Sequence, residues 1–86
     1  MSAGRKTRNT LSSQDQESMI LAAAEVEFAE TGVRKANVDT VAARAGVSRS
    51  TLYRRFANKE ELLVAVAQRQ YERVMRDLDT AVAGLS

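Results

Sequence analysis

Residues 37–63 read NVDTVAARAGVSRSTLYRRFANKEELL, which is two short helical patterns separated by a glycine. The first pattern places apolar side chains at the i, i+3, i+4 and i+7 spacing of one helical face, namely Val38, Val41, Ala42 and Ala45. We therefore predict a helix over residues 38–45, with Asn37 as its N-cap and Gly46 as the residue that ends it.

The second pattern predicts a helix over residues 49–56 with one apolar and one polar face. Ser48 is a suitable N-cap, and Leu52 and Phe56 lie one turn apart, so both point inward. Val47 fills the corner between the two helices. The opposite face carries mostly hydrogen-bond donors, which are Arg49, Ser50, Thr51, Tyr53 and Arg54.

A longer helix is expected before this pair. Ser13 and Gln16 have the spacing of a capping box, and the apolar residues behind them recur at helical spacing. They predict a helix over residues 14–31 that is closed by Gly32, with Val33 turning inward.

The fourth predicted helix is the longest. Asn58 and Glu61 resemble a second capping pair, from which the helix runs to about Val82, with Gly84 beyond it. Its first turns seal the core of the other three helices. Its later apolar residues continue as a line past that core, and they are Tyr71, Val74, Leu78 and Val82.

Together these elements predict an all-α fold, a three-helix helix-turn-helix (homeodomain-like) bundle plus a long fourth helix. Residues 13–86 form this domain, and residues 1–12, which are polar, basic and aperiodic, are expected to be a disordered arm. A chain of 86 residues with 44% hydrophobic content has enough apolar surface for one small core.

The composition argues against catalysis, metal binding and membrane insertion. The chain has neither His nor Cys, so the usual general base, the thiol nucleophile and the main zinc ligands are missing. No apolar run approaches the roughly 20 residues of a membrane-spanning helix. We expect a cytoplasmic protein that is not an enzyme and that uses no cofactor or metal ion.

The charges are unevenly distributed, although the net charge is only +2. Residues 13–33 contain acids and no base, whereas residues 34–59 contain seven bases and a single acid, Asp39. The basic segment coincides with the two short helices. It is therefore a candidate surface for the phosphates of DNA. Two helices joined by a glycine turn place the second helix in the DNA major groove, which is about 12 Å wide and admits one helix.

The stretch quoted above resembles the DNA-binding segment of the tetracycline-repressor (TetR) family, and the resemblance extends over residues 14–66. The residues that carry it are Ala42, Ala45-Gly46-Val47-Ser48, Thr51-Leu52-Tyr53, Phe56 and Asn58-Lys59-Glu60, and in the first helix Ile20-Leu21, Ala23-Ala24, Phe28 and Gly32. Three places depart from the family pattern. Arg55 stands where histidine or tyrosine is usual, Lys35 and Ala36 replace alanine and threonine, and Arg49-Ser50 is this chain's version of a variable stretch.

The resemblance implies roles for individual residues. Arg49, Ser50, Tyr53 and Arg54 resemble positions that meet base edges or the adjacent backbone. Thr51 and Lys59 resemble phosphate contacts. The full predicted DNA-binding set is Arg49, Ser50, Thr51, Tyr53, Arg54, Lys59, Arg55, Asn37 and Ser48.

Structural roles are open for several residues. Tyr53 can instead be partly buried against the preceding helix, and Thr51 can serve only the capping turn. Arg55 can reach a phosphate or pair with an acid of the first helix. Arg44 is interpreted as a solvated charge.

The implied partner is an operator in double-stranded DNA, and the implied role is that of a repressor. Family members usually continue into a helical domain that forms the dimer and holds an effector, and this domain is expected to be absent here. We therefore expect a homodimer for a full-length relative, a monomer or weak dimer for this chain, and a small-molecule effector only with that domain. The alternatives are a protein-interaction module that docks a helix on the Tyr71 to Val82 line, and a small enzyme with Glu60 or Glu61 as its base.

Overall fold

The computed structural model describes residues 13–85, which form four helices and, within that range, no strand. The helices are α2 (Ser13–Thr31), α3 (Val38–Ala45), α4 (Arg49–Arg55) and α5 (Lys59–Leu85). The predicted all-α fold is confirmed. The predicted basic arm at residues 1–12 lies outside the described residues.

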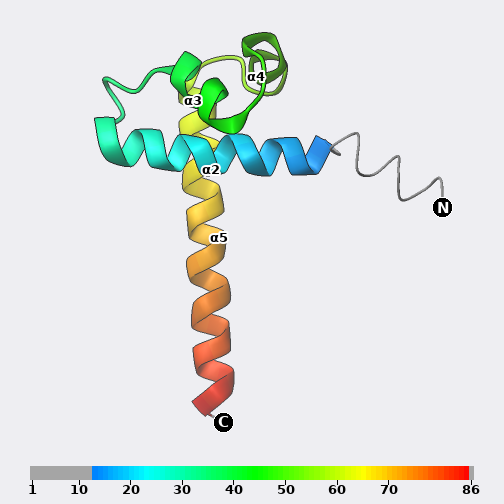
Figure 1. The fold of residues 1–86 in the computed structure, drawn as a ribbon. Coiled ribbons are helices and arrows are strands. Elements are labelled where there is room, and N and C mark those ends of the chain that lie inside the picture. The colour runs from blue at the N-terminus through cyan, green and yellow to red at the C-terminus, as the bar shows by residue number, and fades with distance from the viewer. Residues whose placement is uncertain (1–12, 86) are drawn as a thin grey trace, which may run out of the picture.

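Three helices and the start of the fourth gather at one end of the molecule. Figure 1 shows α3 and α4 on the same side of α2, with α3 against α2 and α4 farther from it, and with α5 crossing α2 and then extending away from the other helices. In sequence order, α3 packs on α2 and α4 packs on α3. The core therefore involves only the first two turns or so of α5, and every residue from Gln70 to Leu85 is exposed.

The core is built from one fully buried large side chain of each helix. These side chains are Ile20, Val41, Leu52 and Leu62, and each is less than 2% exposed. Burying an aliphatic side chain of this size contributes about 1.5–3 kcal/mol relative to leaving it in water. Because the four come from four helices, the same small core fixes the positions of all of them. Of the other predicted core residues Phe56 is buried, whereas Phe28 and Val47 are half-buried at its edge.

Two glycines make the turns that the sequence predicted. Gly32 and Gly46 have φ angles of 86° and 74°, in the left-handed region that costs other residues about 1–2 kcal/mol. After Gly46, the N–H of Val47 donates to the carbonyl of Ala42 at 3.1 Å and closes the end of α3. The second helix of the motif therefore starts at a fixed angle to the first.

The prediction that Val33 turns inward is wrong. After Gly32 the chain makes a turn closed by a 2.9 Å hydrogen bond from the Ala36 N–H to the Gly32 carbonyl. This turn leaves Val33 39% exposed and brings Ala36 into the interior instead.

The helix bounds differ from the predicted ones in three places. α2 begins at Ser13, one residue early. α4 ends at Arg55, because Phe56 is already extended (φ −133°) although its N–H still donates to the Leu52 carbonyl. α5 runs to Leu85 and includes Gly84, so the expected end at Val82 is wrong. A single glycine in a helix costs only about 1 kcal/mol relative to alanine, which is not enough to end a long helix by itself.

Candidate nucleic-acid interface

Both short helices start at side chains that were predicted to cap them. The Asn37 Oδ1 accepts a hydrogen bond from the Asp39 N–H at 2.7 Å, and the Ser48 Oγ accepts one from the Thr51 N–H at 3.0 Å. These bonds satisfy backbone donors that have no partner within the first helical turn. Asn37 and Ser48 therefore have structural roles in the helix-turn-helix, and their side chains lie at the start of its two helices.

α4 presents the predicted polar face to solvent. The Arg49 side chain is 69% exposed, Tyr53 is 41% exposed, and Ser50 and Arg54 are also exposed. The opposite side of the same helix is held in the core by Leu52. An exposed row of donors on a helix with a fixed inner face has the geometry of a major-groove reader.

Hydroxyl groups form a small network at the start of α4. The Ser48 Oγ donates to the Thr51 Oγ1 at 2.8 Å and lies 3.2 Å from the Ser50 Oγ. The Arg54 Nη2 lies 3.5 Å from the same Thr51 oxygen. Thr51 thus takes part in the capping turn, one of the alternatives left open by the sequence, and its half-buried side chain reaches the surface beside Arg54.

Arg55 is directed away from this face, toward α2. Its Nη2 donates to the Oε1 of Gln16 at 2.9 Å, and its Nε is buried without a hydrogen-bond partner in the described part of the chain. The sequence left a phosphate or an acid of α2 as the partner of Arg55. The structure provides an amide of α2 instead, so Arg55 joins α4 to the first turn of α2.

Lys59 joins the start of α5 to the loop between α2 and α3. Its Nζ donates to the carbonyls of Arg34 at 2.9 Å and Ala36 at 3.1 Å. A lysine at a helix N-terminus opposes the helix dipole, and these two carbonyls supply compensating negative charge. An ammonium group has three N–H donors, so one remains for a further acceptor.

The beginnings of α3, α4 and α5 enclose an open groove on the surface. Four residues of the predicted DNA-binding set line it, and they are Asn37, Arg49, Tyr53 and Lys59. Lys35 and Asp39 lie in the same groove, so it contains three cationic side chains and one carboxylate. We call this the basic groove. Its charge suits an anionic backbone.

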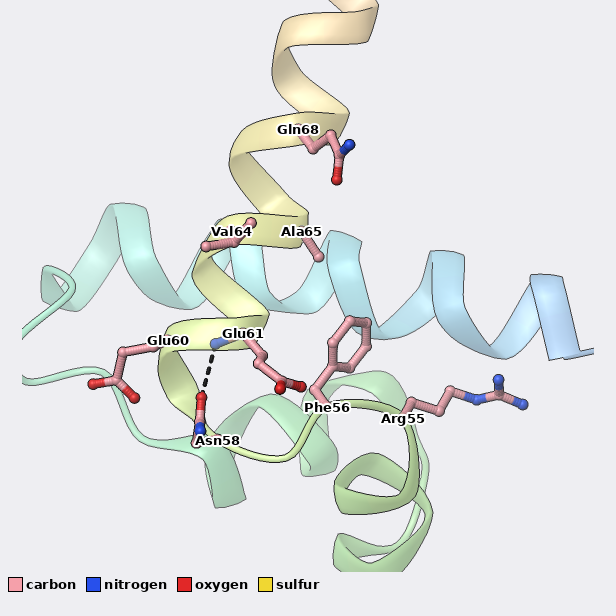
Figure 2. A pocket seen from close by; sticks show the side chains of 8 residues that line it. All are labelled: Arg55, Phe56, Asn58, Glu60, Glu61, Val64, Ala65 and Gln68. Carbon is pink, nitrogen blue, oxygen red and sulfur yellow. Dashed lines mark hydrogen bonds between the residues drawn. The ribbon is translucent and has the colours of Figure 1, made fainter.

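The two carboxylates considered for catalysis do not converge. Figure 2 shows Glu60 and Glu61 at the start of α5, with the Glu60 side chain directed away from that of Glu61. Glu61 takes part in a variant of the capping box: the Asn58 Oδ1 accepts the Glu61 N–H at 2.9 Å, and the Glu61 Oε1 accepts the N–H of Ala57, the residue before the N-cap, at 2.9 Å. Residues 13–85 contain no group of three metal-ligating side chains.

A buried acid that the sequence analysis missed supports the site from behind. Glu27 is 4% exposed, and its Oε2 accepts the backbone N–H of Asn37 at 3.0 Å. The Arg44 Nε lies 3.6 Å from the other carboxylate oxygen of Glu27, and the Arg44 Nη2 contacts Glu30 at 2.7 Å. The Arg44 side chain is 38% exposed, as expected for a surface charge, but it also pairs with two acids of α2, which the sequence did not predict. The signal was present, because Glu27 continues the apolar face of Ile20 and Ala24 at helical spacing.

Comparison with known proteins places the sequence in context. Residues 20–66 match the family described as bacterial regulatory proteins, tetR family. The chain is 34% identical over 79 residues to the HTH-type transcriptional activator FasR of Mycolicibacterium smegmatis, in an alignment that covers 92% of this chain and 36% of that protein. The chain thus spans about a third of the length of this relative. No solved structure matches the sequence.

Of the helices in residues 13–85, none combines the length and apolar character that a membrane crossing requires.

Proposed function

The chain belongs to the tetR family of bacterial regulatory proteins, and we propose that it is a DNA-binding transcription regulator that reads an operator half-site with α4. The observation that carries the proposal is the two-sided character of this helix. Leu52 is buried in the core, while Arg49, Ser50, Tyr53 and Arg54 are exposed on the other side. The core therefore holds the helix, and the exposed residues are available to DNA.

Base reading is assigned to the exposed side chains of α4. The two arginines, Arg49 and Arg54, have the donor geometry that matches guanine O6 and N7, and such a bidentate contact discriminates between bases by about 1–3 kcal/mol. Ser50 and Tyr53 add hydroxyl groups that can meet a base edge or the adjacent backbone. These four residues determine which sequence is preferred.

Backbone contacts are assigned to Lys59, which lines the basic groove, and to Thr51 of α4. Lys59 has one N–H donor left after its two carbonyl contacts, and Thr51 has a hydroxyl group close to Arg54. Phosphate contacts of this kind increase affinity and fix the register of the protein without selecting a sequence. Asn37 and Ser48 hold the helix ends that border the DNA, and Arg55 keeps α4 against α2 through Gln16.

Repression is retained as the expected direction of regulation, on the ground of the family resemblance alone. The relative FasR is named an activator, so family membership by itself does not fix the direction of regulation. A promoter-reporter assay with the operator placed over or upstream of the promoter separates the two outcomes. The site of action is the cytoplasm, where bacterial DNA is found.

The expected DNA-binding unit of a full-length relative is a homodimer. Two recognition helices about 34–36 Å apart contact successive major grooves on one side of a palindrome. Linking two such heads raises avidity by about 10²–10⁴-fold over one head. A single copy of residues 1–86 is expected to bind a half-site weakly, and any small-molecule effector is expected to act through other parts of a longer protein.

Selection followed by titration tests the proposal. A pool of random duplexes is enriched on the immobilised chain, and the enriched duplex and a scrambled duplex of equal length are then titrated by fluorescence anisotropy at two salt concentrations. We expect an enriched motif, tighter binding of that motif, and weaker binding of both duplexes at the higher salt. A chain that enriches no motif, or whose binding ignores salt, would support the protein-interaction alternative.

A further inference from the structure

An ion pair connects the two helices of the helix-turn-helix on its exposed side. The Arg49 Nε lies 2.8 Å from the Asp39 Oδ1, and the two side chains are 69% and 53% exposed. Residues 34–59 contain seven basic residues and a single acidic one, which is Asp39. A carboxylate at the rim of the basic groove repels phosphate, so this position runs against the charge of the surface around it.

The contact uses only part of the guanidinium group. The contact between Arg49 and Asp39 is through Nε, and within residues 13–85 neither Nη1 nor Nη2 of Arg49 forms a hydrogen bond. Recognition of guanine requires two parallel N–H donors from one arginine. The pair therefore restrains the arginine at its inner nitrogen and leaves its two outer nitrogens available.

Asp39 is the better anchored of the two residues. Its backbone N–H is held by the Asn37 Oδ1 at 2.7 Å, in the first turn of α3. The backbone N–H of Asn37 is in turn held by the buried carboxylate of Glu27. Arg49, by contrast, has a long side chain at the first residue of α4. The short Asp39 side chain stands on a held backbone and has fewer rotatable bonds than that of Arg49, so its carboxylate can orient the guanidinium.

We propose that Asp39 is a specificity-determining residue that aims Arg49 at a guanine edge and reduces its binding to phosphate. This inference rests on the proposed DNA-binding function. Without Asp39, the Arg49 side chain would be free to swing to the nearest backbone oxygen of any duplex. Asp39 would then lower the affinity for unspecific DNA and increase the difference between the preferred guanine and other bases.

A simpler interpretation is that Asp39 only stabilises the start of α3 and has no role in reading the DNA sequence. An acid in the first turn of a helix is favourable through the helix dipole, and exposed ion pairs contribute little to stability. If this is all that Asp39 does, its removal changes only the net charge. The informative measurement is therefore sequence discrimination and not thermal stability.

The matched control is another exposed first-turn acid. Glu60 lies in the first turn of α5 and has no contact with Arg49. Glu60→Gln removes one negative charge without disturbing the ion pair, whereas Asp39→Asn removes the same charge together with the pair. Melting curves followed by circular dichroism confirm that both variants are folded.

The experiment measures dissociation constants for the enriched duplex, for versions in which each guanine is replaced in turn, and for a scrambled duplex. For Asp39→Asn we expect scrambled-duplex binding to tighten several-fold, and discrimination at one guanine to fall about tenfold, which corresponds to about 1.4 kcal/mol. For Glu60→Gln we expect any change in affinity to be equal for all duplexes. In an Arg49→Ala background, Asp39→Asn should no longer affect discrimination.

The outcomes separate the two proposals. If Asp39→Asn changes all affinities by one common factor, as Glu60→Gln does, Asp39 has no role in specificity and the inference is wrong, while the DNA-binding function stands. If the wild-type chain prefers no duplex at all, the proposed function fails first, and the inference fails with it.

Discussion

The Glu27 Oε2 accepts a hydrogen bond from the backbone N–H of Asn37 at 3.0 Å, so a buried carboxylate of α2 holds the residue that caps α3. The other oxygen of Glu27 lies 3.6 Å from the Nε of Arg44, in the last turn of α3. One side chain therefore contacts both ends of α3. This contact fixes the first helix of the helix-turn-helix against α2, and with it the direction in which α4 is presented.

Removal of Glu27 should destabilise the domain. Glu27→Ala leaves the Asn37 N–H without its acceptor and Arg44 without its buried partner, which we expect to cost about 1–3 kcal/mol. Thermal unfolding followed by circular dichroism measures the loss. Glu30→Ala, which removes the exposed partner of Arg44, is the control and should cost less than about 1 kcal/mol. Equal losses for the two variants would mean that the buried contact is not important for stability.

Truncation of Phe56 should have a larger effect. The side chain is buried where the chain leaves α4, and replacing a buried phenylalanine by alanine typically costs about 3–5 kcal/mol. Native domains are stabilised by only about 5–15 kcal/mol in total, so this loss is a large fraction of the stability. We expect Phe56→Ala to lose cooperative unfolding near room temperature, whereas Val64→Ala, at a 63% exposed position of α5, should melt like the wild type. A Phe56→Ala variant that melts within a few degrees of wild type would contradict the assigned core.

Substitution of Lys59 and of Lys35 should have the same effect on DNA binding but different effects on the stability of the domain. Both lysines line the basic groove, but only Lys59 also donates to the carbonyls of Arg34 and Ala36. Each alanine variant should weaken binding to all duplexes about equally and lower the salt slope by about one unit. Only Lys59→Ala should also lower stability, by about 1 kcal/mol. A Lys59→Ala variant with altered sequence preference and an unchanged salt slope would contradict its assignment to the backbone.

The exposed half of α5, residues 70–85, should be the part of the described chain that is least protected against amide hydrogen exchange. Within residues 13–85, the last hydrogen bonds from α5 to α2 are those of Arg69 to the Ser18 carbonyl and of Arg73 to Glu25. Helices without tertiary packing are marginal in water. Amide hydrogen exchange followed by NMR should therefore be fast from about residue 74 onward and slow at Leu62 and Val66. Slow exchange throughout residues 74–85, together with a dimer in sedimentation equilibrium, would show that this half of α5 is covered by a second copy.

Local signals in the sequence were sufficient for most of the fold. The ends of α3 were predicted correctly because Asn37 and Gly46 act on the residues next to them. The exposed face of α4 was predicted for a similar reason, since Leu52 and Phe56 leave only one side free. The end of α5 was not predicted, because beyond the core no tertiary contact reinforces the weak local signal of Gly84.

The contacts behind the site could not be predicted from local patterns. Arg44 has acids on another helix as partners, and Lys59 bonds to carbonyls of a loop more than twenty residues earlier. Such pairs form only when the helices are packed at particular positions and angles. Local sequence patterns do not predict this packing. The same holds for Asp39 and Arg49, whose ion pair requires both helices of the motif in place.

The most direct test of the central claim is to map the DNA-bound surface. The ¹⁵N-labelled chain is titrated with the enriched duplex, and the amide signals that shift are assigned to residues. We predict the largest shifts over residues 48–55 and at the borders of the basic groove, near Lys35 and Lys59, with little change beyond residue 70. In Arg54→Ala the same surface should still respond, but with preference relaxed at one or two base pairs. Shifts concentrated on the exposed half of α5, with α4 unaffected, would contradict the assignment of α4 as the recognition helix.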